Sequence, residues 1–400
     1  MSKIFLTNWA RKIKYDDVII FTIGILLALI LRISLLDFKS YDFLKVMKGW
    51  YLNIYQQGFS SFQTGFSNYA PSYLYVLYII ARFFPDTQPQ VAIKVPSLIA
   101  DFIGAWFIYK IVLLKYKDGP IPMFAALASL FAPTVILNGA VWGQIDSVYT
   151  AALIACLYFL LLKKDFFALT AFSIAFSIKF QAVFLAPLIL ILLLKQLVPW
   201  KYILLVPFVY FLTIIPAWIT GRPLFDLITI YFVQIDRYGE LVLNAPNIYN
   251  WFPNTSYLNK FLYPAGLIIA ASMIFLFVAF VYKSRAKLTH EIIILLSLLS
   301  VLLPPYFLPR IHDRYFFPAD VISIIFGFYF PKYFYIPIVI SMTSFFSYQP
   351  FLFNLEIVPM PLLALGLFII IIILMRHAAS LLYTTLTEEK GCLTSSTDIL

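Results

Sequence analysis

An acidic and aromatic stretch, residues 37–75, interrupts a chain that is otherwise apolar. It contains Asp42 at the start of a segment whose apolar residues, from Phe43 to Ile54, recur at helical spacing. A carboxylate there can accept a proton from a nucleophilic hydroxyl, as a general base does. Capping of the helix that follows is the structural alternative. Asp37, closer to the preceding apolar run, is the second candidate for such a base.

A second polar group lies in the short segment GAVWGQID at 139–146. It combines the indole of Trp142, the amide of Gln144 and the carboxylate of Asp146, which together offer an aromatic face, hydrogen-bond donors and acceptors. These are groups that sugar binding uses. Asp146 also opens the next apolar segment, where a carboxylate is favoured by the helix dipole, so a structural role is the alternative.

Cations suited to a phosphate occur at two further places. Lys179 and Gln181 interrupt the apolar run 166–194, and polar residues inside membrane segments are costly enough to indicate function. Snorkelling of the lysine is the alternative. Arg310, His312 and Arg314 follow in PYFLPRIHDRY, where an arginine fork can bind phosphate in a bidentate manner. The alternative there is an ion pair with Asp313.

The histidines and glycines exclude two other kinds of site. Only three histidines occur and they are widely spaced, which argues against metal ligation, although Asp42 and Asp146 could hold a divalent ion. We expect no cofactor and no metal. A glycine-rich phosphate loop is absent from the sequence, so a soluble nucleotide is not the expected donor. His312 remains a candidate base or sugar ligand.

Composition defines the elements that must position these residues. The chain has 400 residues, of which 62% are hydrophobic and 12% charged, and its mean hydropathy is +0.90. Soluble domains carry roughly 25% charged residues, so this chain is an integral membrane protein of the all-α class. Its net charge of +10 falls in short loops between apolar segments, which indicates membrane topology and not nucleic-acid binding.

The distribution of basic residues predicts which segments cross the membrane. Segment 71–84 is about fourteen residues long, short of the roughly 20 that a crossing needs. If it does not cross, the short basic loops all lie in the cytoplasm, as the positive-inside rule favours. We then expect about twelve spans (11–13), both termini in the cytoplasm, and external loops at 37–91 and 220–261. The predicted spans are 17–36, 92–114, 120–138, 145–162, 166–180, 182–197, 201–219, 262–282, 289–307, 314–330, 333–350 and 360–376.

Residues 1–387 are expected to form a single transmembrane domain, followed by a polar, disordered cytoplasmic tail at 388–400. No internal repeat is apparent in the sequence. Within the second predicted span, Asp101 is expected to pair with Lys94 or Lys179, or to support the site. The multi-pass topology fits a bacterial inner (plasma) membrane with the polar loops on the extracytoplasmic side.

The order of these residues resembles a known family. Asp42 precedes Trp50 by eight positions, Lys94 and Asp101 lie between the later segments, and those segments read SNYAPSYLYVL, ILNGAVWGQIDS, FSIKFQAVFLAP and RIHDRYFFPAD. From about residue 17 to 330 the chain resembles the bacterial relatives of GPI-anchor mannosyltransferase II, within the GT-C superfamily of polytopic glycosyltransferases. Two segments depart from the family pattern: FKSYD lacks a glycine-rich lead, which keeps Asp37 as an alternative, and RIHDRY has Asp313 in the acidic position.

The resemblance implies an inverting transfer of a sugar, with mannose as the expected one, from a polyprenyl-phosphate carrier to an acceptor hydroxyl outside the cytoplasm. The acceptor would be lipid-linked, a glycan or another hydroxyl compound. Carried over by position, Asp42 is the base and Asp146 the acid of the second loop. Phosphate binding falls to Lys179, Arg310 and Arg314; sugar or acceptor binding falls to Asn68, Tyr69, Trp142, Gln144, Asp146, Gln181 and His312. The alternative function is a polytopic lipid or glycolipid transporter or flippase, whose ionisable groups would lie near the membrane midplane.

Overall fold

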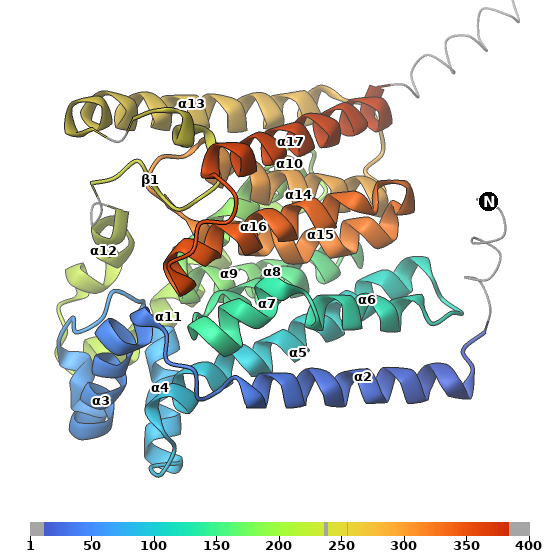
Figure 1. Cartoon of the computed structure of the whole chain (residues 1–400). Helices are drawn as coiled ribbons and strands as arrows, with labels where there is room; N and C mark the ends of the chain where they lie inside the picture. Colours follow the sequence, from blue (N-terminus) through green and yellow to red (C-terminus); the bar gives the residue numbers. More distant parts are fainter. Residues whose placement is uncertain (1–11, 236–238, 254, 384–400) are drawn as a thin grey trace, which may run out of the picture.

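A computed structural model describes residues 12–235, 239–253 and 255–383 of the chain. The predicted tail at 388–400 therefore lies outside the described residues. Helices dominate the described part (Figure 1), which confirms the all-α class. The only strands there are β1 (Val242–Leu243) and β2 (Ile311–His312), which pair in parallel with Val242 opposite Ile311. They join the long loop before α13 (Ser256–Lys283) to the segment that carries Arg314.

Seven helical segments of the described chain are long and apolar enough to cross a membrane. This confirms a polytopic membrane protein. The segments are α2 (Tyr15–Ser34), α5 (Pro89–Lys115), the 3₁₀ helix η6 with α11 (Trp200–Ile219), α13 (Ser256–Lys283), α14 (His290–Phe307), the 3₁₀ helix η9 with α16 (Pro331–Phe353) and α17 (Met360–Tyr383).

A bent pair of helices would make an eighth span. α6 (Ile121–Leu130) is followed at an angle of 48° by α7 (Pro133–Ile136), which continues as the π-helix η4 (Leu137–Trp142). The break has a local cause, since the residue before a proline is pushed out of the helical region and Ala132 has a ψ of 125°. The second half of this pair delivers Trp142 to the site described below.

Other apolar helices are too short to establish a crossing by themselves. These are α8 (Asp146–Leu161), α9 (Asp165–Ile178), η5 with α10 (Phe180–Leu194), α12 (Leu224–Ile235) and α15 (Phe317–Tyr329). The sequence-based count of about twelve spans includes most of these segments, so that count stays a prediction. α8 packs against both α5 and α9, and α15 contacts α14 and α16, so these helices form the centre of the bundle.

Short helices gather at one end of the bundle, at the left of Figure 1. They are the π-helix η2 (Phe43–Met47), α3 (Lys48–Gln57), the 3₁₀ helix η3 (Gly58–Gln63) and α4 (Pro71–Phe83). α4 has 13 residues and runs across the direction of the long helices (Figure 1), and it is not among the segments long enough to span. Along the opposite, right-hand side, α2 begins and α17 ends, so the two helices that bound the described chain start and finish on one side.

A buried ion pair attaches α2 to the bundle. The Arg32 guanidinium donates from Nε to Asp101 of α5 at 2.8 Å, and Asp101 also accepts from Ser147 at 2.5 Å. The sequence-based expectation that Asp101 pairs with Lys94 or Lys179 was wrong. Lys94 instead donates to the backbone carbonyls of Leu35, Leu36 and Phe38, because the end of α2 leaves carbonyl groups without helical partners.

Candidate active site

Asp42 lies at the junction between α2 and η2 with its side chain free of any capping role. The backbone N–H of Phe43 bonds to Ser40 Oγ at 3.2 Å, and Ser40 in turn donates to the Trp142 carbonyl at 2.8 Å. Asp42 precedes η2 but makes no side-chain capping bond to it. Capping was the structural alternative for Asp42, and Ser40 performs it, which leaves the carboxylate available for other contacts.

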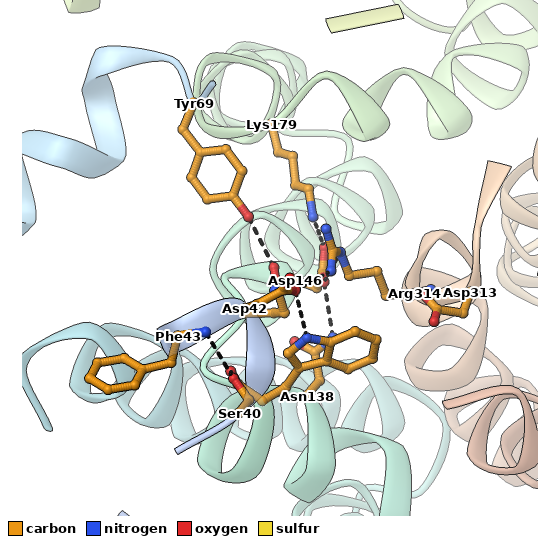
Figure 2. A network of polar contacts seen from close by, with 11 residues as sticks. Ser40, Asp42, Phe43, Tyr69, Asn138, Asp146, Lys179, Asp313 and Arg314 are labelled. Carbon is orange, nitrogen blue, oxygen red and sulfur yellow. Dashed lines mark hydrogen bonds and ion pairs between the residues drawn. The ribbon is translucent and has the colours of Figure 1, made fainter. Parts of the chain in front are cut away.

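All hydrogen bonds to the Asp42 carboxylate from described residues are made to one of its two oxygens, Oδ2 (Figure 2). Oδ2 accepts from Trp142 Nε1 at 2.8 Å and from Gln144 Nε2 at 2.9 Å, and it lies 3.3 Å from Arg314 Nη1. Oδ1 has no hydrogen bond to any residue that the structure describes, and the side chain is 22% exposed. The carboxylate is therefore fixed in orientation through one oxygen while the other can still accept a proton.

Segment 138–144 is folded so that the edge of the Trp142 indole, which carries the N–H, points at the Asp42 carboxylate. η4 is a π-helix, a form often found at functional sites, and Gly143 ends it with a φ of +83°, which favours glycine. The indole is 1% exposed and stacks on Phe351 at 5.0 Å, while the Arg314 guanidinium lies 5.3 Å from it. Trp142 therefore contacts the site in two ways, through its indole N–H, which donates to Asp42, and through its ring, over which Arg314 lies.

Gln144 connects Asp42 to the loop between η3 and α4, which carries Tyr69. Its Oε1 accepts from the Tyr69 hydroxyl at 2.9 Å, and its backbone carbonyl accepts from Ser97 at 2.5 Å. Burial raises the pKa of Tyr69 above its ordinary value, so this hydroxyl is a neutral donor. Tyr69, Gln144 and Asp42 therefore form a chain of hydrogen bonds in which each donor has an acceptor.

Asp146 and Lys179 form a buried ion pair beside this chain. Asp146 is fully buried at the first turn of α8, and its Oδ2 accepts from Asn138 Nδ2 at 2.9 Å while Oδ1 faces the Lys179 ammonium. Lys179 lies at the break between α9 and η5, where its backbone is extended with φ −152° and ψ 134°. The break turns the lysine toward the site, and the aromatic rings of Tyr69, Tyr149 and Tyr315 lie about it at 5.6–6.0 Å.

Arg314 is the cation that joins the two acids. It lies in the 3₁₀ helix η8 (Asp313–Phe316), 3.3 Å from Asp42 Oδ2 and 4.0 Å from Asp146 Oδ2. Burial alone would lower the pKa of Arg314, but Tyr69 and the carboxylates of Asp42 and Asp146 raise this pKa above its ordinary value. Its Nε has no hydrogen-bond partner among the described residues. A further anion could therefore bind this guanidinium without displacing both carboxylates.

Burial shifts the pKa values of Asp313 and His312, the two residues that precede Arg314. Burial raises the pKa of Asp313 from 3.8 to about 7, and its Oδ1 accepts from the Arg314 backbone N–H at 2.8 Å. Burial, with the positive charges of Arg314 and Lys179, lowers the pKa of His312 well below 6.5. His312 is therefore neutral at pH 7, and its ring packs on Tyr315 at 5.3 Å.

Hydrogen bonds and ion pairs bring together seven of the predicted site residues (Figure 2): Tyr69, Asp42, Trp142, Gln144, Asp146, Lys179 and Arg314. Four others lie apart from these contacts. The Arg310 guanidinium stacks on Tyr263 at 3.9 Å, the Asn68 carbonyl accepts from Gln234, and Asp37 is an electrostatic neighbour of Lys94. Gln181 is buried, and its Oε1 has no hydrogen-bond partner among the described residues.

Two residues that hold the site were not singled out from the sequence. Asn138 orients the Asp146 carboxylate, and Ser40 caps η2 and ties it to the Trp142 carbonyl. Both are small polar residues inside segments that the sequence analysis did quote, ILNGAVWGQIDS and FKSYD. The only sequence feature that could have indicated them is a polar side chain next to an apolar run, where such a group is costly. Many other serines in the chain share this feature, so it does not single these two residues out.

Within the described residues, no group of three or more histidine, cysteine, aspartate or glutamate side chains is arranged to hold a metal ion. No protein-family model and no curated protein matches the chain. The fold and site thus define an all-α polytopic membrane protein with a cluster of carboxylates and cations at one end. The assignment of function rests on the chemistry of that cluster.

Proposed function

We propose that the chain is an inverting glycosyltransferase of the GT-C type, which moves a sugar from a polyprenyl-phosphate carrier to an acceptor hydroxyl. The observation that carries the proposal is the Asp42 carboxylate, held at Oδ2 by Trp142, Gln144 and Arg314 and open at Oδ1. A base that is fixed in orientation and still accessible is what abstraction of a hydroxyl proton requires. Mannose is the expected sugar from the family resemblance.

The reaction is a single displacement at the anomeric carbon. The acceptor hydroxyl attacks this carbon and transfers its proton to Asp42 Oδ1, so the new glycosidic bond forms as the proton leaves. The bond between the anomeric carbon and the carrier phosphate breaks with its electron pair on the phosphate oxygen. The products are the glycosylated acceptor and the free polyprenyl phosphate, with the proton on Asp42 until solvent removes it.

Arg314 and Lys179 are proposed to stabilise the departing phosphate. The two cations are linked through Asp146, with which Lys179 pairs directly and which Arg314 approaches within 4.0 Å. The Arg314 Nε makes no hydrogen bond to a described residue, and in the proposed reaction this guanidinium donates to an oxygen of the carrier phosphate. Charge-assisted hydrogen bonds of this kind contribute about 1.5–3 kcal/mol each.

A product assay tests the proposal. Purified full-length protein in detergent is incubated with polyprenyl phosphate carrying a radiolabelled sugar and with a crude membrane-lipid extract as acceptor. Transfer of label to a new lipid or glycan, with release of polyprenyl phosphate, is the expected result, and Asp42→Asn should abolish both. Movement of intact labelled lipid across a vesicle bilayer without release of polyprenyl phosphate would instead identify a flippase.

A further inference from the structure

A buried arginine without a partner lies outside the cluster around Asp42. Arg222 stands in the turn between α11 and α12 and is 8% exposed. Its guanidinium makes no hydrogen bond or ion pair with any residue that the structure describes, and its Nε is buried without an acceptor. Asp226 acts on it electrostatically without forming an ion pair. A buried cation of this kind is costly unless an anion compensates it.

A second uncommitted donor lies next to Arg222. The Tyr75 hydroxyl of α4 accepts from the Ala217 backbone N–H at 3.0 Å, and it donates its own proton to no residue in the described chain. Tyr75 and Arg222 are electrostatic neighbours. By contrast, the nearby Tyr210 hydroxyl donates to the Leu227 carbonyl at 2.7 Å. A guanidinium and a hydroxyl that both lack acceptors are complementary to an oxyanion with several acceptor atoms, as a phosphate has.

The Arg222 guanidinium lies so close to Gly65 that a larger residue at position 65 would crowd it. A Cβ added to Gly65 would lie 3.1 Å from Arg222 Nη2, closer than most side-chain contacts. Gly65 belongs to the first loop after η3, and Tyr69 of the same loop donates to Gln144 beside Asp42. The Gln234 side chain of α12 also bonds to the Asn68 carbonyl. The Arg222 region is therefore connected by one short loop segment to the candidate active site.

The surroundings of Arg222 are those of a membrane surface. The apolar segment Trp200–Ile219 ends just before it, with Trp218 45% and Ile219 75% exposed. On α12, Phe225 is 75% and Phe232 is 70% exposed. Exposed aromatic residues where a span ends are typical of the level of lipid head groups. At the level of the lipid head groups, the phosphate available to Arg222 is that of a lipid.

We propose that Arg222 and Tyr75 bind the phosphate of a lipid head group in the leaflet on the active-site side. This site is separate from the carrier-phosphate contacts assigned to Lys179 and Arg314. If the proposed glycosyl transfer holds, on which this step rests, the lipid is the acceptor: its phosphate lies at Arg222 and its hydroxyl extends along residues 65–69 toward Asp42. The acceptor would then be a phospholipid or phosphoglycolipid.

Lipid binding can be measured without turnover. Full-length protein purified in detergent is titrated with phosphatidylglycerol, or with diacylglycerol of the same acyl chains, and bound lipid is counted by native mass spectrometry. The wild type should bind phosphatidylglycerol at least tenfold more tightly than diacylglycerol. Arg222→Gln should lose this preference by about tenfold, the size expected for charge-assisted hydrogen bonds. Arg82→Gln, which removes an exposed arginine of α4, is the matched control and should retain it.

Further variants and a competitor decide what the site recognises. Tyr75→Phe and Gly65→Ala should each weaken phosphatidylglycerol binding several-fold, and they test the site independently should Arg222→Gln fail to fold. Equal binding by wild type, Arg222→Gln, Tyr75→Phe and Gly65→Ala would overturn the proposal. Complete displacement of phosphatidylglycerol by millimolar inorganic phosphate would overturn the assignment to a lipid. If the protein binds the phospholipid selectively but shows no transfer activity, the proposed glycosyltransferase function is rejected and the proposed lipid-phosphate site is retained.

Discussion

The carboxylate of Asp42 lies 3.3 Å from the guanidinium of Arg314, although 272 positions separate the two residues in the chain. The contact joins the first loop after α2 to the turn between β2 and α15. Trp142 and Gln144, from the segment between α7 and α8, bond to the same carboxylate oxygen. Two distant segments thus fix the acid of a third, and this arrangement makes Asp42 the most sharply testable residue of the site.

Replacing Asp42 by asparagine should abolish transfer. The amide keeps the size of the side chain and can still accept hydrogen bonds at Oδ1, but it cannot take a proton at neutral pH. General base catalysis contributes about 10²–10⁴-fold, so we expect a rate reduced by at least about 10²-fold. The rate of polyprenyl-phosphate release from a labelled donor measures the effect.

Asp37→Asn is the matched control for this experiment. Asp37 is an acid of the same loop, but it is an electrostatic neighbour of Lys94 and makes no hydrogen bond to Arg314, Trp142 or Gln144. It should retain most of the activity. The reverse pattern, in which Asp37→Asn is inactive and Asp42→Asn is active, would transfer the role of base to Asp37.

Trp142→Phe should lower activity while leaving the fold intact. Phenylalanine keeps an aromatic ring against Phe351 but removes the N–H that donates to Asp42 at 2.8 Å. A hydrogen bond to a charged group contributes about 1.5–3 kcal/mol, so a loss of roughly ten- to a hundredfold in kcat is expected if the carboxylate depends on it for orientation. Steady-state rates measured together with the thermal unfolding midpoint separate the two effects.

The exposed Trp106 of α5 provides the comparison. It is 52% exposed and lies against Lys110, away from the site contacts. Trp106→Phe should therefore leave kcat unchanged. If Trp142→Phe had the same kcat as the wild type, the indole N–H would have no part in orienting Asp42.

Much of the cluster was predictable because polar side chains are rare in this chain. Asp42, Asp146, Lys179 and Arg314 each interrupt or adjoin an apolar run, and the topology derived from the basic loops assigned all four to one face. The free-energy cost of a charged group in a membrane segment leaves few explanations other than a partner or a function. The structure does bring these four residues together.

The orientation of side chains was not predictable in the same way. The sequence suggested an aromatic face of Trp142 for sugar binding, and it did not indicate that the ring would be 1% exposed, stacked on Phe351 and beneath the Arg314 guanidinium. Arg32 was not singled out from the sequence, yet it pairs with Asp101. Both outcomes depend on packing between distant helices, which a local pattern of residues does not encode.

Lys179→Met should destabilise the protein by leaving the Asp146 carboxylate buried without its cation. Removing one partner of a buried ion pair costs about 3–5 kcal/mol, and Asp146 is fully buried. The double variant Lys179→Met, Asp146→Asn should recover much of this stability, because the asparagine is neutral and can still accept from Asn138. Unfolding midpoints in detergent for the four proteins of this double-mutant cycle measure the coupling.

The same cycle separates stability from phosphate binding. If Lys179 binds the carrier phosphate, the double variant should remain deficient in donor binding even where its stability is restored. The expected result is a raised donor KM in both variants that lack Lys179, with acceptor KM little changed. Recovery of the donor KM together with the unfolding midpoint would show that Lys179 serves only to neutralise Asp146.

Asp313 should make stability depend on pH in a defined direction. Burial raises its pKa to about 7 in the folded protein from an ordinary value of 3.8, so between these values the folded state holds a proton that the unfolded state has lost. Stability then falls as pH rises from about 4 to about 7 and changes little from this group above that range. Asp313→Asn removes the titration while keeping an oxygen to accept from the Arg314 N–H. The unfolding midpoint of the variant minus that of the wild type should therefore increase from pH 4 to pH 7; a difference that stays constant over this range would exclude a raised pKa for Asp313.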